Sequence, residues 1–200
     1  MKQNRVLGIT GGVGCGKSTV MALLRQHFHA KTIVADEIGH QAMSPGEKPY
    51  QQIIDKFGES IVLPSGELNR PMLANAIYED DKKRECLNQI IHPYVLQEIR
   101  KTIQQWSEEP LVAIETALMF ETGCHRLCDT VWYIRTEPEI RIQRLIDSRG
   151  YSRERAEAIM AAQVTDEEGM RQSDAIIENN GSVKKIINQL QELLGIERKM

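Results

Sequence analysis

Residues 11–18 form a glycine-rich segment of the pattern G-x-x-x-x-G-K-S, with an apolar run before it and a helical pattern after it. Glycines permit positive φ angles, so that successive backbone N–H groups face one cavity that suits a phosphate. Lys17 adds charge beside the transferring phosphate, Ser18 is a candidate ligand of Mg²⁺, and the following helix adds its dipole. The predicted nucleotide-binding residues are Gly12, Val13, Gly14, Cys15, Gly16, Lys17, Ser18 and Thr19. A glycine-rich turn with a chance Lys-Ser pair is the alternative, which the surrounding strand and helix patterns disfavour.

Two carboxylates follow further apolar runs of the chain. Asp36 follows residues 32–35, and Glu115 follows residues 111–114. Ligands of parallel α/β sheets bind outside the carboxyl ends of the strands. Asp36 is therefore a candidate base for an acceptor hydroxyl, and Glu115 is a candidate for the Mg²⁺ shell. The residues leave two alternatives open, namely that Asp36 caps a helix and that local backbone satisfies Glu115.

Six arginines gather between residues 135 and 155. Arg141 and Arg144 are one helical turn apart, and Arg149 precedes Gly150, a plausible hinge. This stretch is a candidate lid that closes over ATP and neutralises developing charge. We expect Arg144 or Arg149 to reach the nucleotide and the other arginines to lie on the surface.

The order of the apolar runs predicts the elements that position these residues. Strand-like runs at 6–10, 32–35, 111–114, 131–134 and 175–177 alternate with helical patterns. This alternation of strands and helices indicates an α/β fold of the phosphate-loop NTPase type, with a parallel sheet of about five strands and flanking helices.

Residues 36–110 contain no strand-like run of comparable strength and are too long for a plain crossover. We expect them to form a helical insertion that binds the acceptor, with helices around 49–57, 70–78 and 82–106. The rest of the single unit of residues 1–200 is then a core of about 1–35 and 111–200, with a lid over about 141–170. The last helix is expected over Val183–Leu194, followed by Gly195 and a charged tail.

Composition narrows the classes of partner and compartment. The 200 residues are 41% hydrophobic and 26% charged with a net charge of −3, which disfavours nucleic acid as a partner. Residues 1–5 resemble neither a signal-peptide core nor a membrane span, so we expect a cytoplasmic protein without a membrane partner. The four cysteines, Cys15, Cys86, Cys124 and Cys128, fit that compartment as reduced thiols. The last two flank His125, but three donors without a second cluster favour packing over zinc.

Taken together, the motifs resemble those of dephospho-coenzyme A kinases. The resemblance runs almost end to end and is carried by residues 9–19, 35–36, 68–70, 87–88, 91–93, 118–121, 163 and 173–181. It implies transfer of the ATP γ-phosphate to the 3′-hydroxyl of dephospho-coenzyme A, the last step of coenzyme A synthesis. The resemblance also implies a nucleotide-binding core, a helical domain for coenzyme A and a lid.

The resemblance implies that Asp36 is the catalytic base. The expected catalytic cations are Lys17 and Arg144. Within the insertion, Arg70 and His92 are candidate contacts to the acceptor's phosphates or ribose. Both residues also have structural alternatives. Arg70 could cap a turn or pair with an acidic side chain, and His92 with Pro93 could begin a helix. We expect a monomer or a weak homo-oligomer.

The chain also departs from the family pattern. Val34 replaces the first acid of Asp-Ala-Asp, Glu115 replaces an aspartate, Arg149 is moved by one place, and Gly169 replaces a frequent lysine. Two other functions remain alternatives. A nucleoside or nucleoside-monophosphate kinase would share the phosphate loop but take another acceptor. A nucleotide-dependent switch would turn over slowly whatever the acceptor, and the chain lacks an evident guanine-specifying Asn-Lys-x-Asp.

Overall fold

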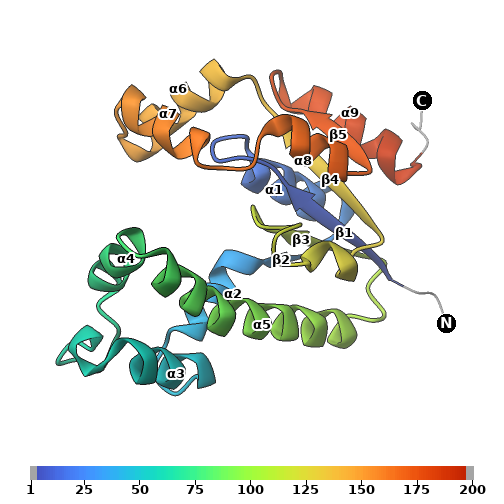
Figure 1. Cartoon of the computed structure of the whole chain (residues 1–200). Helices are drawn as coiled ribbons and strands as arrows, with labels where there is room; N and C mark the ends of the chain where they lie inside the picture. The colour runs from blue at the N-terminus through green and yellow to red at the C-terminus, as the bar shows by residue number, and fades with distance from the viewer. Residues whose placement is uncertain (1–3, 197–200) are drawn as a thin grey trace. The chain divides into compact units, whose positions relative to one another are not determined.

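The computed structural model describes residues 4–196, which fall into two compact units (Figure 1). One unit combines the chain up to Ile33 with the chain from Trp106 onward, and the other is Val34–Gln105. The charged tail expected after Gly195 lies, apart from Ile196, outside the described residues. The segment expected as an insertion, 36–110, therefore differs by a few residues at each end from the second unit.

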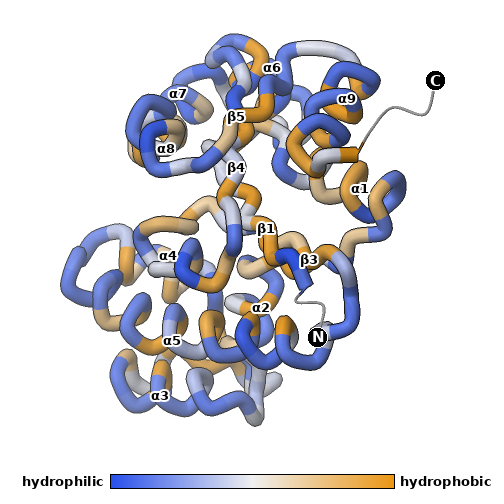
Figure 2. Tube along the Cα trace, turned by 90° about the vertical axis from the view of Figure 1, so that its right-hand side faces the viewer, coloured by the Kyte–Doolittle hydropathy of each residue, from blue (hydrophilic) through white to orange (hydrophobic). Residues whose placement is uncertain are grey.

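A parallel sheet forms the centre of the first unit. Its strands are β1 (Arg5–Thr10), β2 (Lys31–Val34), β3 (Leu111–Glu115), β4 (Thr130–Arg135) and β5 (Ala175–Glu178), in the order β2-β3-β1-β4-β5. The expected α/β fold with about five strands is confirmed. The inner strands read as continuous apolar runs because both faces of a parallel sheet are covered. In Figure 2 the stretches around β1 and β3 are largely orange, in keeping with this burial.

Helices of the first unit complete its core. They are α1 (Lys17–Phe28), α6 (Pro138–Arg149), α7 (Arg153–Ala161), α8 (Asp166–Gln172) and α9 (Val183–Leu194), with a 3₁₀ turn, η2, at Cys124–Leu127. The α9 bounds agree with those expected from the sequence. Leu24 of α1 and Ile186 of α9 join Ile9 and Trp132 of the strands in one buried cluster. This packing fixes the start of α1, and with it the loop that follows β1.

The second unit is helical. It contains α2 (Ala35–Ala42), α3 (Lys48–Phe57), the 3₁₀ turn η1 (Glu59–Ile61), α4 (Arg70–Tyr78) and α5 (Asp81–Gln105). The three helical patterns expected at 49–57, 70–78 and 82–106 are α3, α4 and α5. Its buried cluster joins Ile53, Ile61, Leu68, Leu73 and Leu87.

One expected alternative is wrong in this unit. His92 and Pro93 do not begin a helix, because both lie inside α5. A proline inside a helix costs about 3 kcal/mol through its lost hydrogen bond and its ring clash. Leu87 before it and Ile99 after it are both buried, so tertiary packing on either side of Pro93 holds the helix together.

Candidate active site

The loop between β1 and α1 has the geometry of a phosphate-binding site. Gly16 precedes α1 with φ 90°, a conformation that residues with a Cβ rarely adopt. At Gly12 a Cβ would overlap the guanidinium of Arg141, so a side chain at this position would have to displace that guanidinium from its place beside the loop. The first turn of α1 contains no acidic residue, which leaves the positive end of its dipole to act on an anion.

Lys17 lies against the first part of this loop. Its Nζ donates to the carbonyl oxygen of Gly11 at 2.8 Å and to that of Gly12 at 3.2 Å. A cation held there neutralises the terminal phosphates of a bound nucleotide. Ser18 and Thr19 are exposed in the same turn, so their hydroxyls are accessible to a ligand or an ion.

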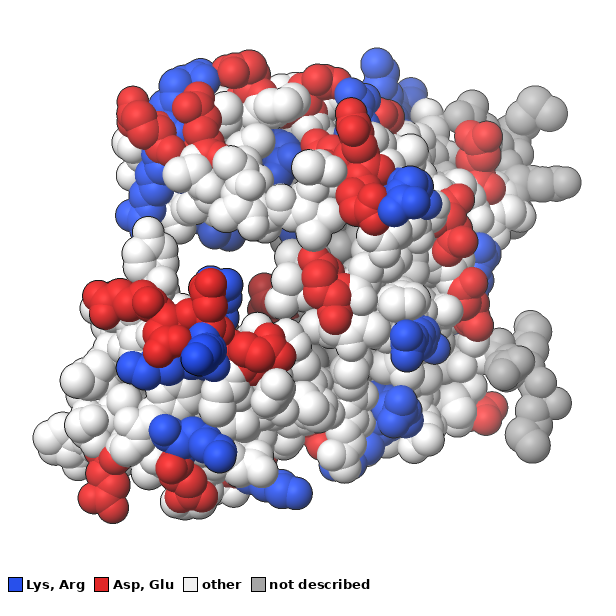
Figure 3. All heavy atoms as spheres, in the orientation of Figure 1, with Lys and Arg blue, Asp and Glu red and all other residues white. Residues whose placement is uncertain are grey.

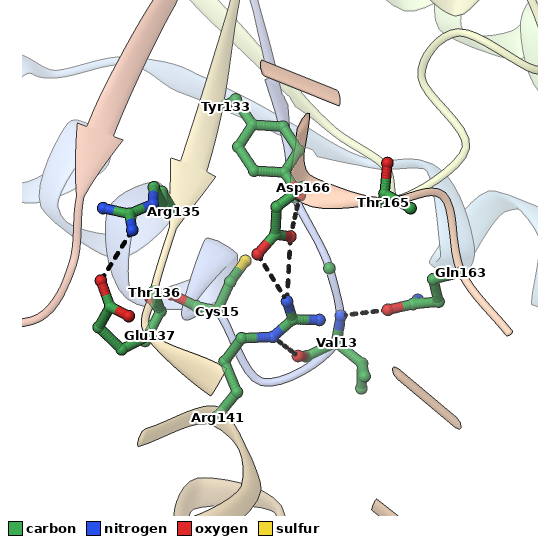
Figure 4. Close-up of polar contacts among 12 residues, drawn as sticks. Val13, Cys15, Tyr133, Arg135, Thr136, Glu137, Arg141, Gln163, Thr165 and Asp166 are labelled. Atoms are coloured by element: carbon green, nitrogen blue, oxygen red, sulfur yellow. Dashed lines mark hydrogen bonds and ion pairs between the residues drawn. The ribbon is translucent and has the colours of Figure 1, made fainter. Parts of the chain in front are cut away.

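Val13 is held through both of its backbone polar groups, as Figure 4 shows. Its N–H donates to Oε1 of Gln163 at 2.7 Å, and its carbonyl accepts from Nε of Arg141 at 2.9 Å. Gln163 lies between α7 and α8, so the loop is tied to the segment expected as a lid. The sequence places Gln163 among the family motifs but does not predict this contact, because Gln163 and Val13 are far apart in the chain.

The expected surface position of Arg141 is wrong, because its side chain is only 6% exposed. Its Nη1 lies 3.0 Å from Oδ1 of Asp166, which also accepts from the Tyr133 hydroxyl at 2.5 Å. A buried guanidinium is tolerated where a carboxylate and a carbonyl satisfy its donors. Burial and the neighbouring Asp166 carboxylate both raise the pKa of Tyr133, so this phenol keeps its proton.

Arg144 also contacts the phosphate loop, from one turn further along α6. Its guanidinium donates to the carbonyl oxygens of Gly14 and Cys15, each at 3.3 Å, and to that of Asn179 at 3.0 Å. Arg149, the other arginine expected to reach the nucleotide, ends α6 and is exposed. Glu139 at the start of α6 pairs with Arg153 of α7 at 2.8 Å. Figure 3 shows acidic and basic side chains interspersed over the face of the molecule that it draws.

The Cys15 carbonyl is a further anchor point that sequence reasoning missed. Besides Arg144, it accepts from Nδ2 of Asn179 at 2.7 Å and from the Thr136 hydroxyl at 2.9 Å. Both donors are buried, and Asn179 belongs to the motif at 173–181. Burial raises the pKa of the Cys15 thiol, which therefore stays neutral inside the core.

Glu115 ends β3 beside Ile9, its partner in the neighbouring strand, and is half-buried. Its carboxylate and the Ser18 hydroxyl are oxygen donors, the type that Mg²⁺ prefers. Among residues 4–196 no group of three or more His, Cys, Asp or Glu side chains forms a ready-made metal cage.

Asp36 belongs to the first turn of α2 in the helical unit. The sequence placed Ala35 in the preceding strand, whereas Ala35 is the first residue of α2 and Val34 occupies the N-cap position. No side chain caps this helix, so the capping alternative for Asp36 is wrong. A carboxylate in the first turn still interacts favourably with the helix dipole.

The two other acceptor candidates also lie in the helical unit. Arg70 begins α4, and its Nη2 donates to the His40 carbonyl at 3.3 Å, so it pairs with a backbone oxygen rather than with an acid. The cap of α4 is Asn69, which accepts from the N–H of Met72 at 3.1 Å. His92 lies in the middle of α5.

The thiols near His125 have local partners. The Cys128 thiol is 3.7 Å from the Cys124 carbonyl oxygen, and Nδ1 of His125 is 3.3 Å from the Met119 carbonyl. The Cys128 and His125 side chains thus contact backbone carbonyls nearby in the chain, which is consistent with thiols that pack.

The parallel sheet, the phosphate loop and the arginine-bearing helix against that loop define a phosphate-loop kinase. Solved structures agree. A crystal structure from Thermus thermophilus matches with a TM-score of 0.82 and 28% identity, over 97% of this chain and 98% of that one. A dephospho-CoA kinase from Campylobacter jejuni matches with a TM-score of 0.69 and 24% identity, over 94% and 96% of the two chains. This second match shows the fold alone.

The family model of dephospho-CoA kinase matches residues 5–185. A dephospho-CoA kinase from Symbiobacterium thermophilum is 38% identical over 189 residues, covering 94% of this chain and 79% of its own. One from Carboxydothermus hydrogenoformans is 34% identical over 191 residues, covering 94% and 92%. The chain belongs to the dephospho-CoA kinase family, so it is an ATP-using kinase whose activity completes coenzyme A biosynthesis. None of the helices in residues 4–196 combines the length and the apolar character that crossing a membrane requires.

Proposed function

We propose that the enzyme works in the cytoplasm with Mg²⁺ and transfers the γ-phosphate of ATP to the ribose 3′-hydroxyl of dephospho-coenzyme A. The observation that carries the proposal is Lys17, held over the Gly11 and Gly12 carbonyls in a chain whose family is dephospho-CoA kinase. A charge fixed there stabilises the phosphoryl group during transfer without reorganisation.

The nucleotide side of the site uses the phosphate loop. Residues 12–19 surround the phosphates and bind them through the backbone N–H groups of the loop other than those of Val13 and Cys15, which donate to Gln163 and to the Gly12 carbonyl. Arg144 and Arg149 act as lid cations toward ATP, with Arg144 taking part in catalysis. Ser18 and Glu115 would hold Mg²⁺, which would supply positive charge against the phosphates when bound. The contact of Arg144 with the Gly14 and Cys15 carbonyls supports its role, because it keeps the guanidinium next to the loop.

The acceptor side uses the helical unit, with Arg70 and His92 as contacts to the phosphates or ribose of dephospho-coenzyme A. Asp36 takes the proton of the 3′-hydroxyl as that oxygen bonds to the γ-phosphorus. The bond between this phosphorus and the oxygen that bridges it to the β-phosphate breaks, and ADP leaves. Asp36 does not cap α2, because Val34 is the N-cap residue and no side chain caps the helix. The absence of this structural role supports the proposed catalytic role of Asp36.

One assay tests the whole proposal. ATP consumption is measured with and without dephospho-coenzyme A, and the product is identified by mass and by its site of phosphorylation. We expect coenzyme A and ADP in equal amounts. Faster phosphorylation of AMP, UMP or a nucleoside would favour the other kinases, and slow turnover independent of any acceptor would favour a switch. Light scattering across a concentration series tests the expected monomer or weak homo-oligomer.

A further inference from the structure

A cavity of about 380 Å³ opens in the helical unit, between α3, η1, α4 and the first turns of α5. This volume falls within the range of about 300–1,000 Å³ that is usual for small-molecule sites. Asp36, Arg70 and His92, the proposed contacts to the acceptor, are not among the described residues that line it. The cavity therefore belongs to a different part of the unit from those contacts.

The most buried part of the lining is apolar. Ile61 of η1 is only 4% exposed, and Phe57 of α3 and Ala76 of α4 are half-buried. Met72 of α4 is 44% exposed, so one long apolar side chain at the cavity is open to solvent. Its thioether is flexible and adapts to the shape of a partner. An apolar or aromatic body in the cavity would remove this surface from water, which is favourable.

Three lysines provide the charge of the cavity. Lys56 comes from α3, Lys82 and Lys83 come from α5, and all three residues are exposed. The described residues of the lining include no aspartate or glutamate. In the part of the chain that the structure describes, none of the three ammonium groups forms an ion pair or a hydrogen bond, whereas the neighbouring Arg84 pairs with Asp81 at 2.8 Å. In a chain whose net charge is −3, this is a local surplus of unpaired positive charge, which attracts anions.

Two of these lysines lie where they disfavour their own helix. Lys82 and Lys83 belong to the first turn of α5, where the positive end of the helix dipole repels a cation. Two N–H groups of this turn already have an acceptor, because Oδ1 of Asp80 accepts from the N–H of Lys82 at 2.9 Å and from that of Lys83 at 3.3 Å. An anion in the cavity would therefore be held by the side-chain ammonium groups, and it would relieve their repulsion.

Another cavity of similar size lacks this combination. It measures about 420 Å³, lies beside β5 and α9, and has Lys185 and Glu178 in its lining. Its other described lining residues are asparagine, glutamine and glycine, so it offers neither an apolar wall nor a surplus of positive charge. The cavity of the helical unit is thus distinguished by its chemistry, an apolar interior beside unpaired cations, and not by its volume.

We propose that the cavity of the helical unit binds a small molecule in which a phosphate or carboxylate group is attached to an apolar body. The anionic group lies among Lys56, Lys82 and Lys83, and the apolar body packs on Met72 and Phe57. A bare anion would lack the second set of contacts, and an uncharged apolar molecule would lack the first. The inference does not depend on the proposed function, since none of the residues proposed to bind ATP or the acceptor is among the described residues of the lining.

Methyl NMR of the wild-type enzyme tests the site with 1-naphthyl phosphate, which joins a phosphate to an aromatic body. Protein labelled at Ile and Met methyl groups is titrated in the presence of saturating ADP, which occupies the phosphate loop. We expect saturable shifts of the Ile61 and Met72 signals and none of Ile176, an exposed residue on β5. 1-Naphthol and inorganic phosphate should each bind about tenfold more weakly or worse, because each lacks one set of contacts. Absence of the Ile61 and Met72 shifts, or equally tight binding of 1-naphthol or of inorganic phosphate, would overturn the proposal.

A matched pair of double variants tests the lysines. Lys82→Gln/Lys83→Gln and Lys184→Gln/Lys185→Gln each remove two consecutive exposed lysines from the first turn of a helix, α5 in one case and α9 in the other. The α5 variant should raise the dissociation constant of 1-naphthyl phosphate by about fivefold or more, through two lost charge interactions, and the α9 variant should leave it unchanged. High salt should weaken binding to the wild-type enzyme, because it screens exposed charges. Equal affinity of the two variants would contradict the role of the lysines.

Kinase assays show whether the cavity belongs to the acceptor site instead. Both double variants should keep the wild-type kcat and the wild-type KM for dephospho-coenzyme A, and dephospho-coenzyme A should not compete with 1-naphthyl phosphate for the cavity. Competition between the two compounds, or a raised KM in the α5 variant alone, would overturn the proposal of a separate site.

Discussion

Gln163 accepts a hydrogen bond at 2.7 Å from the backbone N–H of Val13, a residue 150 positions earlier in the chain. Arg141 donates to the carbonyl of the same residue, so both polar groups of this peptide position are occupied by side chains from α6 and the segment before α8. The conformation of a glycine-rich loop is costly to fix, because glycine loses more backbone entropy than any other residue. Two side-chain anchors at Val13 reduce that freedom before a phosphate binds.

Replacing Gln163 should therefore impair catalysis more than folding. In the Gln163→Met variant the Val13 N–H loses its acceptor, while the side chain at position 163 keeps its length. We expect kcat/KM for ATP to fall by about tenfold, which is the effect of losing one hydrogen bond to a partly buried donor. The matched control is Gln143→Met, because Gln143 lies exposed on α6 and donates to Asp147 one turn away. Steady-state kinetics and thermal unfolding of both variants check this. An unchanged kcat/KM in Gln163→Met would show that the anchor is dispensable.

The ion pair of Arg141 with Asp166 should contribute to stability. Asp166→Ala leaves a guanidinium that is 6% exposed without its carboxylate, and we expect a loss of about 2–3 kcal/mol in the free energy of unfolding. The control is Glu139→Ala, which breaks the exposed pair with Arg153 and should change stability hardly at all. Urea unfolding of the two variants measures the difference. Equal losses would mean that burial does not strengthen the Arg141 pair.

The sequence predicted most of the framework because local patterns encode it. Apolar runs located the strands, and the bounds of α4 and α9 agree with the expected ones because Asn69 and Gly195 mark their ends. The contacts of the site could not be predicted in the same way. Arg141 looks like a surface residue of an amphipathic helix, and only the fold brings it to Val13 and Asp166.

One departure from the family pattern has a structural reason. Gly169 replaces a frequent lysine, and a Cβ at this position would overlap the ring of Tyr133. The Tyr133 hydroxyl bonds to Asp166, so the ring is fixed where a longer side chain at residue 169 would begin. The sequence shows that the lysine is missing. It does not show that residue 169 packs against Tyr133, because the two positions lie 36 residues apart in the chain.

Loss of Lys17 should affect chemistry far more than stability. Lys17→Ala removes the ammonium that lies over the Gly11 and Gly12 carbonyls, and we expect kcat to fall by about 10³-fold, as for other groups that stabilise charge in the transition state. Lys184→Ala on α9 changes the net charge equally and should leave kcat unaffected. Single-turnover kinetics with ATP and dephospho-coenzyme A measure the chemical step. Near-normal kcat in Lys17→Ala would contradict the assignment of the loop.

The helical unit should lose stability at high pH through Tyr94. Its hydroxyl donates to Glu47 at 2.7 Å, and burial, reinforced by this carboxylate, raises the pKa of Tyr94 to about 12 from 10.0. The raised pKa means that the protonated phenol stabilises the fold below pH 10, and that this contribution is lost as the pH rises from 10 to 12. Tyr94→Phe should lack this loss, whereas Tyr78→Phe, at a residue that is 88% exposed, should keep it. Unfolding by urea at pH 9, 10.5 and 12 provides the comparison, and parallel curves for all three proteins would remove Tyr94 as the cause.

Asp36 offers a direct test of the proposed base, with its own neighbour as the control. Asp36 and Glu37 both lie in the first turn of α2, so each interacts with the same helix dipole, and neither is the cap. Substituting either by its amide removes one negative charge from this turn, and the two variants should lose similar, small amounts of stability.

Only Asp36 is proposed to take the proton of the acceptor hydroxyl. Asp36→Asn should therefore lower kcat by about 10²-fold or more, whereas Glu37→Gln should retain most of the wild-type rate. The binding of ATP should change little in both, since the phosphate loop is untouched. Rates measured from pH 6 to 9, together with thermal unfolding, separate loss of a base from loss of structure. Full activity in a folded Asp36→Asn enzyme would exclude Asp36 as the base, and Glu115, the carboxylate that ends β3, would be the next residue to test.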